Sequence, residues 1–263
     1  MFVVFPHSFW TQEGVSGNKH YVGQSGSYAE RLTGINSSIL AYYTFDTTAP
    51  LAYTGDSVRS FHFISGSGLT PGTFISSGQR GGGLQFPAVS NRQMYIQNSH
   101  TGWRLSGQSM TWAGWVRTFN STPTNFSWLI KGTEYGINWG TPSRGVGMFV
   151  TTGTGDAGGA SYSCYWTGST VLNTWNFFTV CWNHQTTGIS VSMNNGTFVT
   201  SGIPGQPNYR NGNGFVTGQW GSQFDQLSTD FDEIGVWNRV LTTDEVDYLY
   251  NKGNGRTYPF TGS

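Results

Sequence analysis

The chain has 263 residues, of which 13 are basic and 13 acidic, so its formal net charge is +0 and only 10% of its residues are charged. This balance lacks the basic surface that binding to a phosphate backbone requires, which excludes nucleic acid as an expected partner. Aromatic residues make up 16% of the chain and glycine occurs 38 times. Disordered chains are poor in aromatic residues, and turn-forming residues in place of Lys and Glu favour an all-β fold.

The first 35 residues show no clean hydrophobic periodicity and are rich in Gly, Ser and Gln. We interpret residues 1–35 as an extended N-terminal arm for docking or oligomerisation, followed by a single domain at 36–263. The opening MFVVFPHSFW has no basic region and no small-residue cleavage site, so it does not predict a secretory signal. No stretch approaches the roughly 18 apolar residues of a membrane span.

From residue 39 onward, short apolar runs alternate with turn residues, which predicts many short strands. The run TWAGWV at 111–116 has the period of two that is typical of a strand with one face on a core. Asn195-Gly196 between two such runs predicts a hairpin, because both residues tolerate positive φ. The predicted strands are 39–46, 83–86, 92–97, 110–118, 127–132, 135–139, 145–151, 162–166, 176–183, 189–193, 214–218 and 231–237. This series predicts an antiparallel β-sandwich.

Residues 242–253 predict one short helix near the C-terminus. Thr242 and Glu245 are three residues apart and match a capping box. The apolar positions 246, 249 and 250 then share one helix face, and Gly253 is placed to end the helix.

Five segments in order carry a family resemblance. The most specific is FDEIGVWNRVLT at 231–242, followed by Glu245, Val246, Leu249 and Tyr250. It is preceded by AYYTFD at 41–46, GGGLQF at 81–86, SMTWAGWV at 109–116, and WNFF at 175–178 with Gly188 and NNG at 194–196. From about Leu40 to Tyr258 the chain resembles the pentraxin-like, laminin-G-like branch of the concanavalin A-like lectin/glucanase superfamily, a type found in phage and marine microbial surface proteins. The resemblance implies an all-β, two-sheet antiparallel sandwich of the jelly-roll kind with one short C-terminal helix.

Several residues of these segments have an expected structural role. Trp115 and Trp175 are predicted to supply apolar bulk to the core between two sheets. Arg239 is predicted to hold the last strand to the helix through a charge-assisted pair, with Asp232 and Glu233 as its neighbours in sequence. We therefore interpret Asp232 and Glu233 as structural anchors.

The superfamily includes glucanases, so catalytic carboxylates must be considered. A retaining glycosidase needs two carboxyl groups about 5 Å apart. Asp230 and Asp232 share a strand face, but no glutamate partner follows at the needed spacing. The five histidines form no zinc-binding pattern and no phosphate-binding loop is present. We expect no enzyme activity, and glycoside hydrolysis is the alternative.

Calcium is the one cofactor that the resemblance leaves open, because relatives of this fold often bind it. Oxygen ligands are available from Asp46, Asp56, Asp156 and Asp232, together with backbone carbonyls. The alternative for each is a turn-forming role, since Asp bonds to its own backbone in turns.

Glycan binding would require exposed aromatic rings beside amide groups. The candidates are Trp220, Tyr209, Asn211, Asn213, Tyr165 and Trp166. The first four form a polar and aromatic mixture suited to stacking on a pyranose ring. The alternative is burial in the core or in a subunit interface, where most aromatic residues of such a chain lie.

The two cysteines, Cys164 and Cys181, are predicted to be buried thiols, and a disulfide remains open if their strands pair. Two cysteines do not define a redox compartment.

The weakly charged surface, the Gly/Thr/Asn richness and the N-terminal arm favour a virion surface component. This would be a phage fibre, a receptor-binding protein or a capsid-decoration protein that also binds glycan. A stand-alone lectin and a glucanase are the alternatives. The expected partners are other virion or surface proteins through the arm, cell-surface glycan and further copies of the chain, because little charge keeps the molecules apart. The expected location is the virion, or otherwise the cell exterior.

Overall fold

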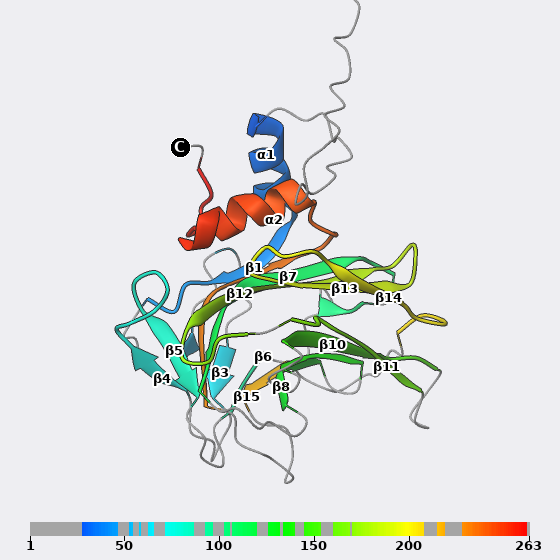
Figure 1. Cartoon of the computed structure of the whole chain (residues 1–263), viewed down its shortest axis with the longest axis horizontal. Helices are drawn as coiled ribbons and strands as arrows, with labels where there is room; N and C mark the ends of the chain where they lie inside the picture. Colours follow the sequence, from blue (N-terminus) through cyan, green and yellow to red (C-terminus); the bar gives the residue numbers. More distant parts are fainter. Residues whose placement is uncertain are drawn as a thin grey trace, which may run out of the picture.

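The computed structural model describes residues 28–46, 53–54, 58, 63–65, 72–86, 93–96, 103–105, 107–119, 126–131, 134–139, 145–153, 160–168, 170–207, 215–218 and 228–261. Within these ranges the strands form two antiparallel sheets that face each other (Figure 1). Two helices lie on the outer side of one of the sheets. This arrangement confirms the predicted two-sheet sandwich with a short C-terminal helix.

Sheet A consists of β1 (Ile39–Tyr43), β4 (Thr73–Ile75), β5 (Gly83–Phe86), β7 (Met110–Thr118), β12 (Trp175–Asn183), β13 (Gly188–Met193), β14 (Val199–Gly202) and β16 (Thr229–Trp237). The order across the sheet is β14–β13–β12–β7–β16–β5–β4, and β1 pairs with β16. The closing segment of the sequence therefore forms a central strand, with neighbours on both sides.

Sheet B consists of β2 (Tyr53–Thr54), β3 (Phe63–Ser65), β6 (Gln93–Ile96), β8 (Phe126–Lys131), β9 (Tyr135–Trp139), β10 (Val146–Thr151), β11 (Ser161–Tyr165) and β15 (Phe215–Gly218). The order is β11–β10–β9–β8–β15–β6–β3–β2. The short strands β2, β3, β4 and β14 add to those that the sequence predicted.

The core lies between the two sheets and is rich in tryptophan. Trp103, Trp112, Trp139 and Trp182 are fully buried there. The ring centroids of Trp103 and Trp112 are 4.9 Å apart. Fully buried rings of this size contribute a large share of the hydrophobic stabilisation.

A second apolar cluster lies on the outer face of sheet A, beneath α1 (Tyr28–Ser38) and α2 (Thr243–Tyr250). Trp115 belongs to this cluster and contacts Phe177 and Tyr250, with ring centroids 5.2 Å and 5.9 Å away. Trp175 is half-buried at its margin, with the Arg117 guanidinium 4.8 Å from its ring centroid. The prediction that Trp115 and Trp175 fill the space between the sheets is therefore wrong. The strand alternation places position 112 inward and position 115 outward.

The capping box predicted for α2 is present. The Thr242 hydroxyl accepts a hydrogen bond from the Glu245 amide, and the Glu245 carboxylate accepts one from the Thr242 amide. The helix ends earlier than predicted, because Asn251 adopts the left-handed conformation with φ of 48°. Residues Asn251–Gly253 then form one 3₁₀ turn, η2.

The helix α1 was not predicted, since residues up to 35 were expected to be extended. Instead Ile35 is fully buried in the outer cluster, and its carbonyl accepts a hydrogen bond from the Trp237 indole at 3.1 Å. The end of the expected arm is thus a helix packed on sheet A. Residues 1–27 lie outside the described residues, so the arm itself stays a prediction.

Arg239 does connect the last strand to the helix, but its partner is Glu245 and not Asp232 or Glu233. The two guanidinium nitrogens donate to the two Glu245 oxygens at 2.6 Å and 2.7 Å, and Arg239 Nε donates to Ser38 at 3.0 Å. A bidentate pair of this kind fixes geometry as well as charge. One side chain therefore links α1, α2 and the end of β16.

Cys164 on β11 and Cys181 on β12 lie in different sheets, and both are free, buried thiols. Burial raises the pKa of Cys181 to about 11, and it also raises the pKa of Cys164. Because the thiolate is the reactive form, we expect neither to react with Ellman's reagent in the native protein. Unfolding in guanidinium should release both thiols, and rapid labelling of the native protein would contradict this burial.

Candidate functional site

The predicted site residues divide between described and undescribed segments. Tyr165, Trp166, Asp46 and Asp232 are described. Trp220, Tyr209, Asn211, Asn213, Asp56 and Asp156 lie outside the described residues. Of the described ones, Asp46 and Asp232 lie near each other at sheet A, whereas Tyr165 and Trp166 lie at sheet B. Three locations must therefore be compared: the acidic cluster, the space between the helices, and the outer face of sheet B.

The acidic cluster is built around an irregularity in β16. The pairing of β16 with β7 shifts register between Asp232 and Gly235, and Glu233 there has a φ of 50°. Both acidic side chains are buried, with 0% and 3% of their surface exposed. A bulge in a central strand thus places two adjacent carboxyl groups inside the protein.

Backbone amides of the turn at 78–82 bind this cluster. The Arg80 amide donates to Asp232 Oδ2 and the Gly82 amide donates to Asp46 Oδ1, both at 2.8 Å. The Thr257 hydroxyl donates to Glu233 Oε1 at 2.6 Å. The carboxyl groups therefore tie the turn and the C-terminal segment to β16.

The same carboxyl groups are costly to ionise. The pKa of Asp232 is raised to about 9, chiefly by burial and in part by the charges of Glu233 and Asp46, while the hydrogen bond from the Arg80 amide opposes the shift. Burial likewise raises the pKa of Glu233 to about 7. Asp232 Oδ1 and Glu233 Oε2 have no hydrogen-bond partner in the described part of the chain.

Calcium coordination by this cluster is not supported by its geometry. No three His, Cys, Asp or Glu side chains of the described residues are placed to share a metal ion. A calcium site therefore stays a prediction, as it does for Asp56 and Asp156.

The carboxylate pair considered for hydrolysis is not available to a sugar. Asp230 is fully buried, forms an ion pair with Arg117 at 2.6 Å, and accepts a hydrogen bond from Gln85 at 3.0 Å. Asp232 is also fully buried. Two carboxyl groups inside a central strand cannot flank a glycosidic bond.

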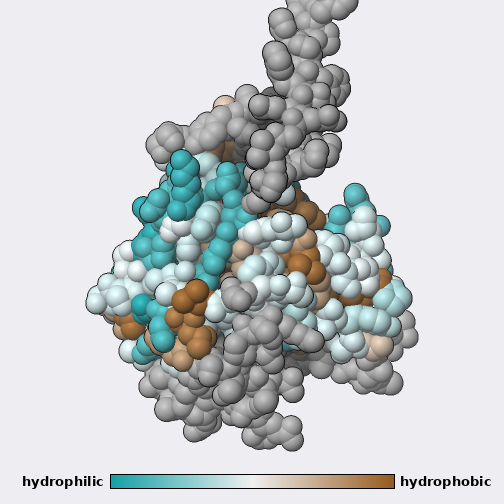
Figure 2. All heavy atoms as spheres, viewed as in Figure 1, coloured by the Kyte–Doolittle hydropathy of each residue, from teal (hydrophilic) through white to brown (hydrophobic). Residues whose placement is uncertain are grey.

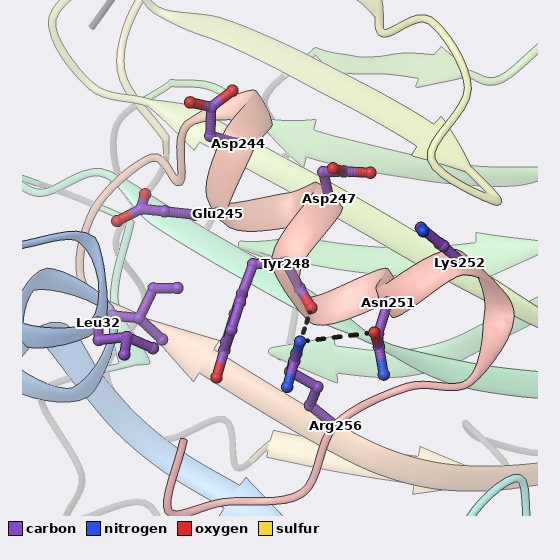
Figure 3. Close-up of a pocket in the computed structure, with 9 residues that line it drawn as sticks. Leu32, Asp244, Glu245, Asp247, Tyr248, Asn251, Lys252 and Arg256 are labelled. Carbon is purple, nitrogen blue, oxygen red and sulfur yellow. Dashed lines mark hydrogen bonds between the residues drawn. The ribbon is translucent and has the colours of Figure 1, made fainter. Parts of the chain in front are cut away.

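A pocket of about 400 Å³ lies between α1 and α2 (Figure 3). It is lined by Leu32, Ile35, Asp244, Glu245, Asp247, Tyr248, Asn251, Lys252 and Arg256. Some of its polar groups bind one another: Arg256 donates to the Tyr248 carbonyl at 2.9 Å and to Asn251 Oδ1 at 3.5 Å. Asp247 accepts a hydrogen bond at 2.6 Å from Asn195, which lies outside the pocket. The exposed side of α2 is hydrophilic (Figure 2). We therefore interpret this pocket as a solvent-filled gap between the two helices and not as a ligand site.

The outer face of sheet B has a different composition. The side chains of Val146, Met148 and Val150 point into the core, so Gly147 and Phe149 face outward. Gly147 pairs with Tyr165 on one side and with Asn138 on the other. Strands β9, β10 and β11 therefore present a continuous outer surface.

Tyr165 crosses this surface. A side chain at Gly147 would overlap the Tyr165 ring, so the ring lies over the glycine. Its hydroxyl accepts a hydrogen bond from Asn138 Nδ2 at 2.9 Å, two strands away. The tyrosine is thus held along the sheet, half-exposed.

Phe149 of β10 lies over a glycine of the next strand, β9, in the same way. It pairs with Gly136 of β9, and a side chain there would overlap the Phe149 ring. Phe149 is half-exposed as well. Two aromatic rings, each made possible by a glycine on the neighbouring strand, therefore lie side by side on the outer face.

Asn138 lies beside these rings with only 8% of its surface exposed. Its Nδ2 bonds to Tyr165, but its Oδ1 has no hydrogen-bond partner among the described residues. An unsatisfied buried amide oxygen is costly, and a donor from a bound molecule would remove that cost.

Trp166, by contrast, has a packing role in the fold. Its ring packs against Gly145 and Gly168, where any side chain would clash with it, and it borders the core between the sheets. The sequence grouped it with Tyr165, but only Tyr165 lies on the outer face. Four residues of this face were not predicted as site residues from the sequence: Phe149, Asn138, Gly136 and Gly147. The period of two in VGMFVT could have placed Gly147 and Phe149 on one face, whereas their partners depend on strand register.

Comparison with known proteins shows the fold alone. No family model and no curated protein matches the chain. Among solved structures, it is similar to the binding domain of Paraclostridial Mosquitocidal Protein 1, with a TM-score of 0.65 and 12% identity over 83% of this chain and 53% of that one. It is also similar to botulinum neurotoxin type C in a structure concerned with its interaction with two ganglioside molecules (TM-score 0.63, 11% identity, 84% and 52% covered). A third is the binding domain of botulinum neurotoxin DC in complex with SialylT (0.60, 10%, 82% and 52%). The chain spans about half the length of each of these structures.

Proposed function

We propose that this chain is a non-catalytic glycan-binding module displayed on a virion or a comparable particle surface. The observation that carries the proposal is the Tyr165 ring, which is held over Gly147 by the Asn138 amide. A fixed, half-exposed aromatic ring beside an amide is the arrangement on which a pyranose ring stacks.

The rest of the fold supports the choice of this face. The outer face of sheet A at β1, β7, β12 and β16 is covered by α1, α2 and the C-terminal segment. The acidic cluster is inside the protein, and Arg256 between the helices is bonded to Tyr248 and Asn251 of the same pocket. The outer face of β9–β11 is then the described surface best suited to a ligand.

The solved neighbours support the same function class. Two of the three are described as binding domains, and two of the descriptions name a ligand, either ganglioside molecules or SialylT. Their ligands belong to those proteins. For this chain they support recognition of surface glycan by an all-β domain of similar fold.

The particle-bound part of the proposal rests on the sequence. Low charge, the Gly/Thr/Asn-rich composition and the arm before α1 favour attachment to other surface proteins and to further copies of the chain. A stand-alone lectin with the same face is the alternative. Detection of the chain in purified particles supports the first, and a soluble protein absent from every particle fraction supports the second.

A glycan array tests the binding function directly. The labelled full chain should bind a defined subset of glycans, and the Tyr165→Ala variant should lose these signals while it unfolds at the same temperature. Parallel arrays with Ca²⁺ and with EDTA test the calcium prediction. Absence of signals under both conditions would count against glycan recognition.

A further inference from the structure

We infer that the outer face of β9–β11 recognises uncharged glycans and discriminates against sialylated and other acidic ones. This inference rests on the proposed glycan binding and specifies the ligand class of the same site. The three strands of this face carry no charge. The strands read YGINW, VGMFVT and SYSCY, and none of them contains a charged residue.

Recognition of a carboxylate sugar needs a cationic or multiple-donor partner. In proteins this role falls to Arg or Lys, because their charge-assisted bonds offset the loss of hydration. A carboxylate placed on the rings of Tyr165 and Phe149 would lose hydration with no cationic partner from these strands. The flanking charged residues Arg144 and Asp156 lie outside the described residues. A neutral hydroxylated ring avoids this cost.

The polar groups on this face are neutral hydroxyl and amide groups. The exposed hydroxyls of Ser161 and Ser163 lie on the same face as Phe149, through the pairing of β10 with β11. Asn138 Oδ1 is a hydrogen-bond acceptor without a partner among the described residues. Sugar hydroxyl groups donate to amide oxygens and exchange hydrogen bonds with serine. The face therefore matches aromatic stacking and neutral hydrogen bonding.

The two aromatic rings occupy separate positions on the sheet. Tyr165 lies over β10 and Phe149 lies over β9, at positions two residues apart along the sheet. Neighbouring strands are about 5 Å apart, and alternate residues of a strand are about 7 Å apart. The rings therefore offer two separate stacking positions. An oligosaccharide should bind more tightly than a single sugar, because it engages both.

The closing experiment compares matched glycans. The full chain is tested by array and by calorimetry against neutral hexose oligomers, against the same neutral cores carrying terminal sialic acid, and against uronic-acid oligomers. We expect binding to the neutral oligomers, and at least about a tenfold weaker affinity when sialic acid is placed on the binding unit. Binding should change little between low and high salt, since no charge pair contributes.

Four variants locate the site. Tyr165→Ala should lower the affinity at least about tenfold, and Gly147→Val should do the same, because the new side chain displaces the ring. Tyr165→Phe keeps the ring and should lose only a few-fold, through the Asn138 bond. Tyr248→Ala, in the pocket between the helices, is the control and should bind like the wild type. Circular dichroism and thermal unfolding check that each variant is folded.

The outcomes separate the inference from the proposed function. If sialylated or uronic-acid glycans bind in preference to neutral ones, glycan binding stands and the inference is wrong. If neutral glycans bind but Tyr165→Ala and Gly147→Val match the wild type, the assignment to this face is wrong. If no glycan binds, the proposed function fails and the inference fails with it.

Discussion

Replacement of Asp232 by asparagine is expected to stabilise the protein at alkaline pH and to flatten its stability profile. The folded protein keeps a proton on Asp232 up to about pH 9, because burial raises its pKa. The unfolded chain releases that proton near pH 4. Between these values the folded state binds more protons, so the free energy of unfolding falls as pH rises, by about 1.4 kcal/mol per pH unit for one such group.

Urea unfolding at pH 5, 7 and 9 in the presence of EDTA measures this effect. The wild type should lose several kcal/mol between pH 5 and pH 9, whereas Asp232→Asn should lose much less. The amide oxygen of the asparagine can still accept the bond from the Arg80 amide. Glu233→Gln is the matched variant, and it should flatten the profile only up to about pH 7, where the raised pKa of Glu233 lies.

The opposite outcome is informative. An Asp232→Asn variant that is less stable than the wild type at pH 9 would show that the ionised carboxylate has a favourable partner. A repeat of the measurement with Ca²⁺ in place of EDTA would then identify that partner as calcium, if the wild type alone gains stability.

Removal of the Trp115 side chain is expected to detach α2 from sheet A. Trp115→Ala leaves a large cavity beneath the helix, where the ring contacts Phe177 and Tyr250. Substitution of a buried Trp by Ala typically costs about 3–5 kcal/mol. We expect a loss of this size in the free energy of unfolding, together with faster hydrogen exchange in residues 243–250.

The half-buried Trp175 provides the control for this experiment. Trp175→Ala removes a ring of the same size at the margin of the outer cluster and should cost clearly less. Equal losses for the two variants, or unchanged exchange in α2 when Trp115 is removed, would contradict the role given to Trp115.

Two of the elements that the sequence did not predict, β14 and α1, have a physical reason in common. The strand β14 has the sequence VTSG and lies at the edge of sheet A with alternate residues exposed, so it carries little apolar signal. The helix α1, YAERLTGINSS, offers Leu32 and Ile35 to the outer cluster but is otherwise polar. Both elements depend on the tertiary surface beneath them. By contrast, β7 and β9 were predicted with correct ends, because turn residues flank their apolar runs.

The candidate site was only partly predictable for a related reason. Tyr165 was predicted as a glycan-binding candidate, but its placement on the outer face depends on Gly147 and Asn138 on other strands. Strand register brings these residues together, and a single sequence does not specify register across three strands. The placement of Trp115 outside the core has the same origin, since alternation separates two faces but does not say which layer covers each face.

The two ends of the described chain lie on the same side of the domain, which determines where the domain can be attached to another structure. Helix α1, which begins at Tyr28, and the C-terminal residues up to Thr261 both lie on the helix-covered side of sheet A, where Asn36 donates to the Phe260 carbonyl at 3.0 Å. Anything joined to the domain at either of these points is attached on one side of the sandwich. The rings of Tyr165 and Phe149 lie on the opposite side. A tether at either end would therefore leave the aromatic surface facing away from the point of attachment.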